Sequence, residues 1–188
     1  MKRVIIIHRW SGGPQDDWRP WLSNELRSRG YDVFVPEMPE TDHPQIDKWV
    51  GKLADLVGVP DENTYFVGHS IGCQAIMRYL QTLPVGSRVG MTVFVAGWFN
   101  LAGLDAEGGE VVSIARPWIE TPIEYENIKK VCSNINVFLS GNEPYNYVEH
   151  NKEVFENKLN AHVTTLPSRG HFTEDDGVTE LPEVLELF

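Results

Sequence analysis

Six short, mostly apolar runs punctuate the chain, rich in Val, Ile and Phe and with little alternation between apolar and polar positions. They lie at residues 4–7, 33–35, 65–67, 91–96, 137–139 and, more weakly, 162–166. Strands that are buried on both faces have this pattern, because helices cover both sides of a parallel sheet. The runs therefore predict about six buried strands.

Between these runs, apolar residues recur at helical spacing. The first such stretch carries Trp18, Trp21, Leu22 and Leu26, with Asp16 and Asp17 ahead of it as candidate caps. Residues 46–56 and 71–80 repeat the pattern, and an acidic amphipathic stretch covers residues 180–188. Strands that alternate with helices predict three α/β layers: a mostly parallel sheet with helices on both faces. The length of 188 residues fits one domain, residues 1–188.

Residues 97–128, between the fourth and fifth expected strands, break the alternation. They contain Trp98, Phe99, Trp118 and four glycines, without a clear period. Loops that follow the carboxyl ends of parallel strands line the ligand crevice of such sheets, and long loops are often functional. We therefore expect Trp98 and Phe99 to contact a substrate.

Charge and composition narrow the range of partners. The chain has 16 Lys and Arg residues against 27 Asp and Glu, a formal net charge of −11. Such a chain repels nucleic acid and anionic lipid surfaces, and no apolar run approaches the roughly 18 residues that span a bilayer. Two cysteines make no disulfide framework, which favours a reducing cytoplasm. Whether the protein is a monomer or a dimer stays open.

The motif that carries chemistry lies at residues 68–72, Gly-His-Ser-Ile-Gly. It follows the strand at 65–67 and begins the helix at 71–80. A sharp strand-to-helix turn presents the Ser hydroxyl above the sheet, flanking glycines let the backbone approach closely, and the helix N-terminus stabilises negative charge. The motif predicts Ser70 as a nucleophile. The alternative is a glycine-rich turn in which the serine only caps the helix.

A serine nucleophile needs a base and an acid that orients the base. His171 follows the last expected strand, and Glu143 follows the fifth, which matches the chain order Ser, acid, His. Glu149, six residues further on, is the alternative acid. Either position could instead hold an ordinary surface side chain.

An oxyanion hole needs two backbone N–H donors. Ile71, directly after the expected nucleophile, supplies one, and the loop after the first strand supplies the other, with Trp10 the first choice and Ser11 the second. Gly12 and Gly13 lack the flanking pattern of a phosphate-binding loop. We find no metal-binding signature and expect no cofactor.

These motifs together resemble a known family. The pieces are His-Ser-Ile-Gly-Cys at 69–73, Val-Ala-Gly at 95–97 and Gly-His-Phe at 170–172 with acidic residues at 174–176, besides Met-Pro at 38–39 followed by Trp49. Over nearly its whole length the chain is similar to the small α/β-hydrolase family of retinoblastoma-binding protein 9 and YdeN-like serine hydrolases.

The resemblance implies a minimal α/β-hydrolase fold of six strands without a large lid domain. It also implies cofactor-free, cytoplasmic hydrolysis of small carboxylic esters. The chain departs from its relatives at two positions: Arg9 stands where they usually have Gly, and Glu143 where they usually have Asp.

Two functions remain in competition. The first is a serine hydrolase that cleaves small carboxylic esters through a Ser-His-acid triad and an acyl-enzyme intermediate. The second is a non-catalytic binding protein that keeps the hydrolase fold, because a fold alone does not specify an activity. The survival of Ser70, Glu143 and His171 in the expected order favours the hydrolase.

Overall fold

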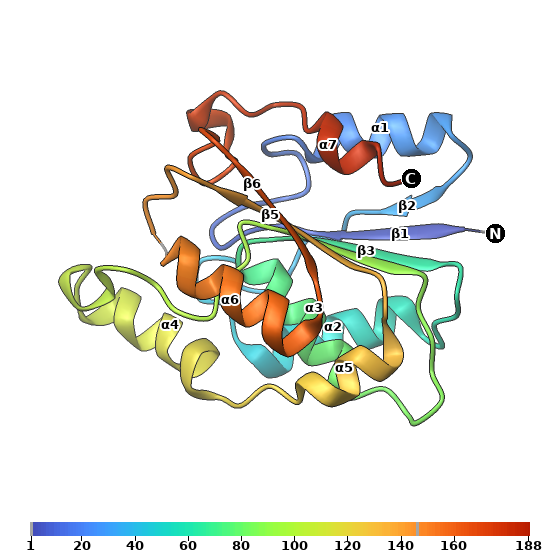
Figure 1. Ribbon diagram of the computed structural model, residues 1–188, viewed down its shortest axis with the longest axis horizontal. Helices are drawn as coiled ribbons and strands as arrows, with labels where there is room; N and C mark the ends of the chain where they lie inside the picture. Colours follow the sequence, from blue (N-terminus) through green and yellow to red (C-terminus); the bar gives the residue numbers. More distant parts are fainter. Residues whose placement is uncertain (1, 146) are drawn as a thin grey trace.

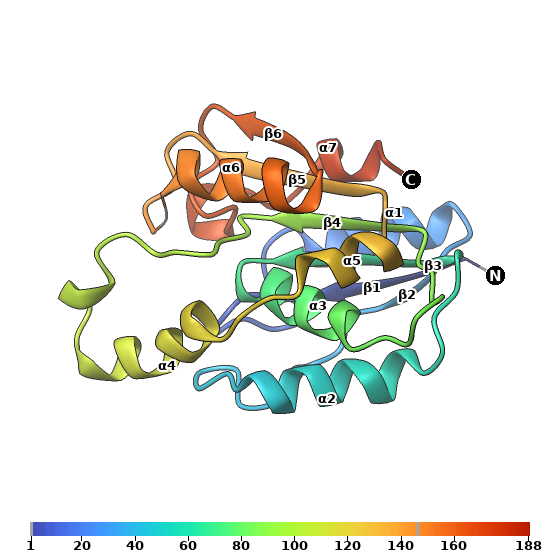
Figure 2. The same ribbon diagram turned by 60° about the horizontal axis from the view of Figure 1, so that its bottom comes forward.

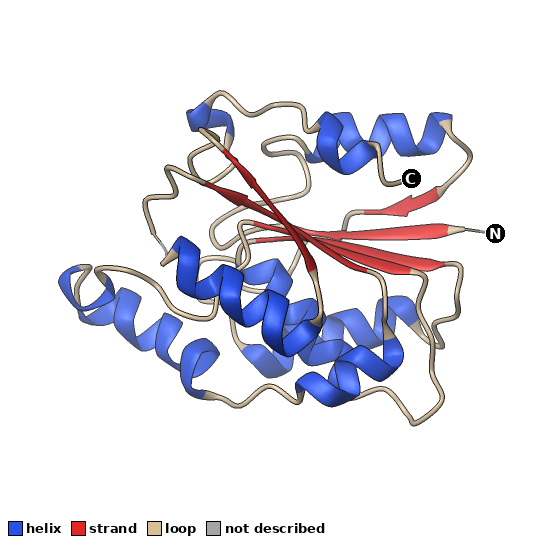
Figure 3. Cartoon of the chain, in the orientation of Figure 1, coloured by secondary structure: helices blue, strands red, loops and turns tan. Residues whose placement is uncertain are grey.

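A computed structural model of the protein describes residues 2–145 and 147–188. In these residues six strands form one parallel sheet in the order β2-β1-β3-β4-β5-β6. Figure 3 shows the sheet in red, with helices on either side of it. The strands are β1 (Arg3–Ile7), β2 (Asp32–Phe34), β3 (Thr64–His69), β4 (Met91–Val95), β5 (Ile135–Ser140) and β6 (His162–Leu166). Each lies within two residues of its expected run, so the predicted sheet is confirmed.

Helices cover both faces of this sheet, as predicted (Figures 1 and 2). They are α1 (Arg19–Ser28), α2 (Ile46–Val57), α3 (Ile71–Gln81), α4 (Gly109–Glu120), α5 (Tyr125–Val131), α6 (Val148–Leu159) and α7 (Pro182–Leu185). α1 and α7 pack on one face, and α2, α3, α5 and α6 on the other. In the described residues no large lid domain covers the sheet, and none of the helices there has the length and apolar character needed to cross a membrane.

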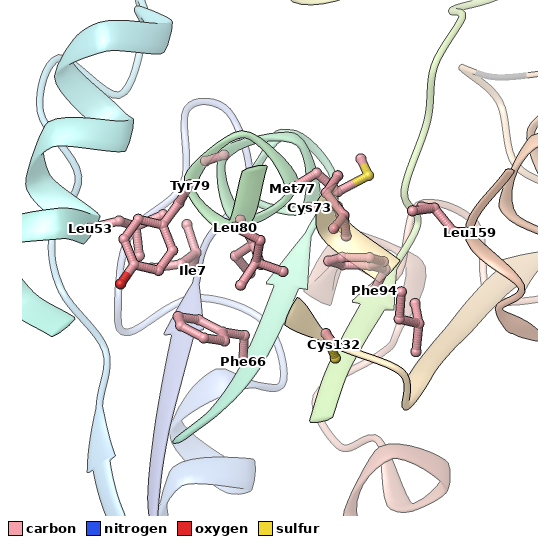
Figure 4. Packing of buried hydrophobic residues seen from close by; sticks show 14 of the residues in the cluster. Ile7, Leu53, Phe66, Cys73, Met77, Tyr79, Leu80, Phe94, Cys132 and Leu159 are labelled. Atoms are coloured by element: carbon pink, nitrogen blue, oxygen red, sulfur yellow. The ribbon is translucent and has the colours of Figure 1, made fainter. Parts of the chain in front are cut away.

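Burial on both faces explains why the strands read as continuous apolar runs. Along β1, Ile5 and Ile7 belong to the core under α2 and α3, whereas Val4 and Ile6 belong to the core under α1 and α7. Figure 4 shows part of the larger core, where side chains of α3 meet those of the strands. Close packing on both faces makes the sheet rigid, and the sheet in turn holds the ends of the loops that follow its strands.

The segment 97–128 is more ordered than its sequence indicates. It contains a short 3₁₀ turn, Leu104–Ala106, followed by α4 and α5. Gly109 at the start of α4 and Pro117 within it obscure the helical pattern. Tertiary contacts hold α4 instead: the buried Trp118 donates its Nε1–H to the Pro44 carbonyl at 3.0 Å, and Arg78 of α3 donates to the Trp118 carbonyl at 2.8 Å.

The expected caps of α1 are wrong. Trp18 occupies the N-cap position, and no side chain there makes a capping hydrogen bond. The Asp17 carboxylate instead lies 2.9 Å from Arg19 Nη2 and 3.0 Å from Arg9 Nε, with its side chain fully buried. A buried carboxylate needs charged partners more than a helix terminus needs a cap. The last helix is also shorter than expected, because α7 covers only part of residues 180–188.

Candidate active site

Ser70 lies at the junction of β3 and α3 in a strained backbone conformation, with φ +54° and ψ −119°. The neighbouring glycines make this turn possible. A Cβ added at Gly68 would lie 2.8 Å from the Cys73 nitrogen, and one added at Gly72 would lie 2.5 Å from the Ile7 carbonyl oxygen. Backbone strain of this kind persists where the surroundings enforce it, and it concentrates at functional sites.

The hydroxyl of Ser70 accepts a hydrogen bond from the indole Nε1–H of Trp98, with 3.3 Å between the two atoms. Trp98 follows β4, as expected for a residue of the site. Ser70, Trp98 and His171 all line the same cavity. Among the residues that the structure describes, no hydrogen bond joins the Ser70 hydroxyl to His171; catalytic hydrogen bonds often tighten only when substrate binds.

Glu143 and His171 are in direct contact. Both carboxylate oxygens of Glu143 lie 2.9 Å from Nδ1 of His171. The carboxylate is fully buried and also accepts the Tyr145 backbone N–H at 3.2 Å. Glu149, the alternative acid, is an exposed residue in the first turn of α6. The structure thus brings Glu143 to His171.

The loops that carry these two residues are joined along their length. The Ser140 hydroxyl accepts the Arg169 N–H at 2.9 Å, and the Asn142 side-chain oxygen accepts the Gly170 N–H at 2.8 Å. Two side chains of the loop after β5 thereby fix the backbone immediately before His171. The separation of Glu143 from the imidazole is therefore set by the loops as well as by the pair itself.

The backbone of His171 is held by two more side chains. Its N–H donates to the Asp176 carboxylate at 2.8 Å, and its carbonyl accepts the Nε2–H of His69, also at 2.8 Å. Its neighbours Gly170 and Phe172 both have positive φ, so no regular element positions this residue. Neither Asp176 nor His69 was expected at the site. Asp176 belongs to the acidic stretch that follows Gly-His-Phe in the sequence, whereas the contact of His69 with His171 joins residues 102 apart and leaves no pattern beyond the position of His69 before Ser70.

The loop after β1 distinguishes the two candidate oxyanion donors. The Ser11 N–H is engaged, because it donates to the Thr41 carbonyl at 2.9 Å. The Trp10 N–H has no acceptor among the described residues. Ile71 is the first residue of α3, so its N–H has no partner within the helix. Trp10 and Ile71 thus keep free donors.

His8 fixes the path of this loop. Its Nδ1–H donates to the Arg9 carbonyl at 2.8 Å, and its Nε2 accepts the Met38 N–H at 3.0 Å. One nitrogen donates and the other accepts, which requires a neutral ring. Burial agrees, because desolvation lowers the pKa of His8.

The cavity above Ser70 has a volume of about 660 Å³. Its apolar wall is formed by Trp10, Trp98, Leu101, Leu104, Val111 and Ile114. The structure places Phe99 elsewhere: it is buried in the core, with its ring centroid 4.7 Å from that of Phe155. Much of the wall thus comes from α4 and the residues before it.

The lining of the cavity carries an excess of acidic residues. It has five carboxylates, namely Asp42, Glu107, Glu110, Asp175 and Asp176, against one cation, Arg9. The Nε of Arg9 already faces the buried carboxylate of Asp17. A lining of this charge repels anions. Within residues 2–145 and 147–188, no group of three His, Cys, Asp or Glu side chains is arranged to hold a metal ion.

Comparisons with known proteins agree with this geometry. A family model described as serine hydrolase matches residues 4–188. YdeN of Bacillus subtilis is 26% identical over 99% of this chain and 94% of its own, and the serine hydrolase RBBP9 of Rattus norvegicus is 26% identical over 98% and 92%.

Solved structures show the same fold. The crystal structure of the B. subtilis ydeN gene product has a TM-score of 0.89 and covers 100% of this chain and 96% of its own. Est1E of Butyrivibrio proteoclasticus with bound ferulic acid has a TM-score of 0.72 at 14% identity and covers 100% and 86%. The match over residues 4–188 shows that the chain belongs to the serine hydrolase family and has the α/β-hydrolase fold.

Proposed function

We propose that the protein hydrolyses small, neutral carboxylic esters through an acyl-enzyme intermediate on Ser70, with His171 as the base and Glu143 as the orienting acid. The observation that carries the proposal is the contact of both Glu143 oxygens with His171 Nδ1, beside a strained serine in the same cavity. No metal or cofactor takes part in this reaction.

The reaction has two halves. The Ser70 oxygen attacks the ester carbonyl carbon while Nε2 of His171 takes the hydroxyl proton. The N–H groups of Ile71 and Trp10 hold the negative oxygen of the tetrahedral intermediate. His171 then gives its proton to the leaving alcohol as the carbon–oxygen bond breaks. In the second half a water molecule attacks the acyl-enzyme by the same route, which releases the carboxylic acid and restores Ser70.

Glu143 makes this proton transfer possible. Its carboxylate accepts a hydrogen bond from the Nδ1–H of His171, so the lone pair of the imidazole is on Nε2. The negative charge of Glu143 also stabilises the imidazolium that forms when His171 takes the proton. The hydrogen bond from Trp98 is compatible with Ser70 as the nucleophile. The Ser70 oxygen accepts from the indole, and its own proton remains free to be donated to His171.

The cavity supports a neutral substrate. Its apolar wall suits an acyl chain or an aromatic alcohol, whereas its acidic residues disfavour a second carboxylate on the substrate. Arg9, the single cation of the lining, faces Asp17 with its Nε. Simple esters such as p-nitrophenyl butyrate fit this description.

Covalent labelling with a fluorophosphonate, read by intact mass, tests the proposal. We expect one adduct on the wild type and none on Ser70→Ala. Ser11→Ala is the matched control, because Ser11 lines the same cavity, and it should label normally. A folded wild type that takes up no adduct and turns over no ester would instead be the binding protein that competes with this proposal.

A further inference from the structure

The side chain that holds the His171 carbonyl is itself held. His69 is completely buried, its Nε2 donates to the His171 carbonyl at 2.8 Å, and its Nδ1 lies 3.1 Å from Arg19 Nη1. A guanidinium can only donate, so Nδ1 is the acceptor and the ring proton is on Nε2. Burial, which lowers the pKa of His69 well below 6.5, keeps the ring neutral.

Asp17 in turn holds Arg19. Its carboxylate lies 2.9 Å from Arg19 Nη2, and both side chains are fully buried. The same carboxylate lies 3.0 Å from Arg9 Nε and accepts the Glu174 N–H at 3.0 Å. One side chain thus touches the loop of the Trp10 donor, the first residue of α1 and the loop that carries His171.

We propose that Asp17, Arg19 and His69 form a buried brace that positions His171, and that Asp17 couples this base to the loop that carries the Trp10 N–H. The inference rests on the proposed function, because it assigns these residues a role in the reaction of Ser70. None of the three needs to touch the substrate. They are positioning residues that act through the backbone on either side of the cavity.

The need for a brace follows from the local backbone. His171 lies between two residues of positive φ, outside any helix or strand. One backbone hydrogen bond spans it, from the Phe172 N–H to the Arg169 carbonyl at 2.8 Å, and side chains hold its own N–H and carbonyl. A displacement of about 1 Å of a reacting group can lower a rate by about 10².

The cost of burying charge points the same way. Well-packed apolar side chains can replace a buried ion pair without loss of stability. Stability alone therefore does not explain why Asp17 and Arg19 are charged here. Their directional contacts explain it, because they hold His69 in one orientation.

Four variants separate positioning from stability. His69→Leu removes the donor to the His171 carbonyl, and His69→Gln restores an amide N–H of similar reach. Asp17→Asn removes the charge while tolerating the φ of +54° at this residue. Leu26→Ala is the control: it removes core volume from α1 on the same face of the sheet, far from the polar contacts of the brace.

The measurements are kcat per active site titrated with the fluorophosphonate, KM for p-nitrophenyl butyrate, and Tm. We expect His69→Leu and Asp17→Asn each to lower kcat about 10²-fold with KM within threefold of the wild type. His69→Gln should keep kcat within about tenfold. Leu26→Ala should lower Tm and leave kcat per titrated site unchanged. Because Asp17 acts on His171 partly through Arg19 and His69, the double variant Asp17→Asn with His69→Leu should lose clearly less than the product of the two single losses.

The proposal is overturned if His69→Leu and Asp17→Asn keep kcat per titrated site within threefold of the wild type, or if their losses multiply. If His69→Leu does not fold, the comparison of His69→Gln with Asp17→Asn decides by the same limits. Labelling of the wild type reports separately on the proposed function. A labelled, active wild type with unaffected variants would therefore refute the brace alone.

Discussion

The indole Nε1–H of Trp98 points at the hydroxyl oxygen of Ser70 across 3.3 Å, from the loop after β4. An N–H donor stabilises an oxygen that gains negative charge more than it stabilises a neutral hydroxyl. In the proposed reaction the contact should therefore strengthen as Ser70 gives up its proton to His171. Trp98 is more than part of the cavity wall, since it contacts the atom that we propose as the nucleophile.

We expect Trp98→Phe to lower kcat by about tenfold or more, with little change in KM, because the ring is largely kept and the donor is lost. The Trp98 carbonyl is held by Gln74 at 2.6 Å, so the loop should keep its path. Steady-state kinetics on p-nitrophenyl butyrate measure the effect. Trp118→Phe is the control: it loses an indole hydrogen bond outside the cavity and should affect stability only. An unchanged kcat in Trp98→Phe would show that its donor plays no part.

Substitution of Glu143 should give the order wild type > Glu143→Asp > Glu143→Gln in kcat/KM. Asp keeps the charge but shortens the reach, so we expect a loss of about 10- to 100-fold. Gln can favour the wrong imidazole tautomer and cannot stabilise imidazolium, a change that can lower kcat about 10⁴-fold in serine proteases. The assay is ester hydrolysis at about pH 8. Glu149→Gln should be neutral; a Glu143→Gln variant within threefold of the wild type would return the role to Glu149 or to no acid.

Gly72→Ala should disrupt the turn at Ser70. The added Cβ would lie 2.5 Å from the Ile7 carbonyl oxygen, so we expect the free energy of unfolding to fall by about 1–3 kcal/mol or more. Fluorophosphonate labelling should fall with it. Gly51→Ala, in α2, meets no atom within 4 Å and should raise the free energy of unfolding by up to about 1 kcal/mol. Urea denaturation compares the two, and equal stabilities would contradict the packing argument.

Acid should destabilise the fold through its buried histidines. Burial lowers the pKa of both His8 and His69, so the unfolded chain binds more protons than the folded one once the pH drops below about 6.5. The stabilisation is present above that pH and is lost as the pH falls. Each histidine contributes a slope of at most about 1.4 kcal/mol per pH unit. Between pH 6.5 and 5, His69→Gln should show a shallower decline in the free energy of unfolding than the wild type; parallel declines would show that His69 does not titrate on unfolding.

The wall of the cavity should set the preference for acyl chains. Ile114 of α4 is half-buried and lines the cavity, so Ile114→Ala removes apolar contact from a longer chain and little from acetate. At about 0.8 kcal/mol for each buried CH₂, we expect kcat/KM to fall about three- to tenfold for hexanoate and to change little for acetate. Val112→Ala, on the same helix but outside the cavity lining, is the control. Equal losses for both esters would remove α4 from the acyl site.

The sheet could be predicted from the sequence because strands buried on both faces leave a local record, as the run of Val4, Ile5, Ile6 and Ile7 illustrates. α4 could not, because its stability comes from Trp118 and Arg78, whose partners lie far away in the chain. Gly109 and Pro117 within α4 disfavour a helix by local propensity.

The candidate site divides in the same way. Ser70 carries a five-residue motif, and Glu143 and His171 follow from chain order and position after a strand. The sequence already favours Trp10 over Ser11, but the contact that engages the Ser11 N–H comes from the Thr41 carbonyl, which is remote in sequence. Asp17 resembled a helix cap, because a carboxylate ahead of an amphipathic stretch has that meaning locally; its ion pairs exist only in the folded chain.

Arg78 joins α3 to the C-terminal end of α4 through hydrogen bonds. It donates to the Trp118 and Thr121 carbonyls, at 2.8 and 2.9 Å, so the helix that begins beside Ser70 also grips the far end of α4. A Cβ added at Gly68 or Gly72 would meet backbone atoms, so the turn at Ser70 tolerates little change, whereas much of the cavity wall belongs to α4, whose buried contacts lie toward its C-terminal end. Substitutions in α4 would therefore change which substrates fit the cavity, while the Arg78 contacts and the turn at Ser70 stay as they are.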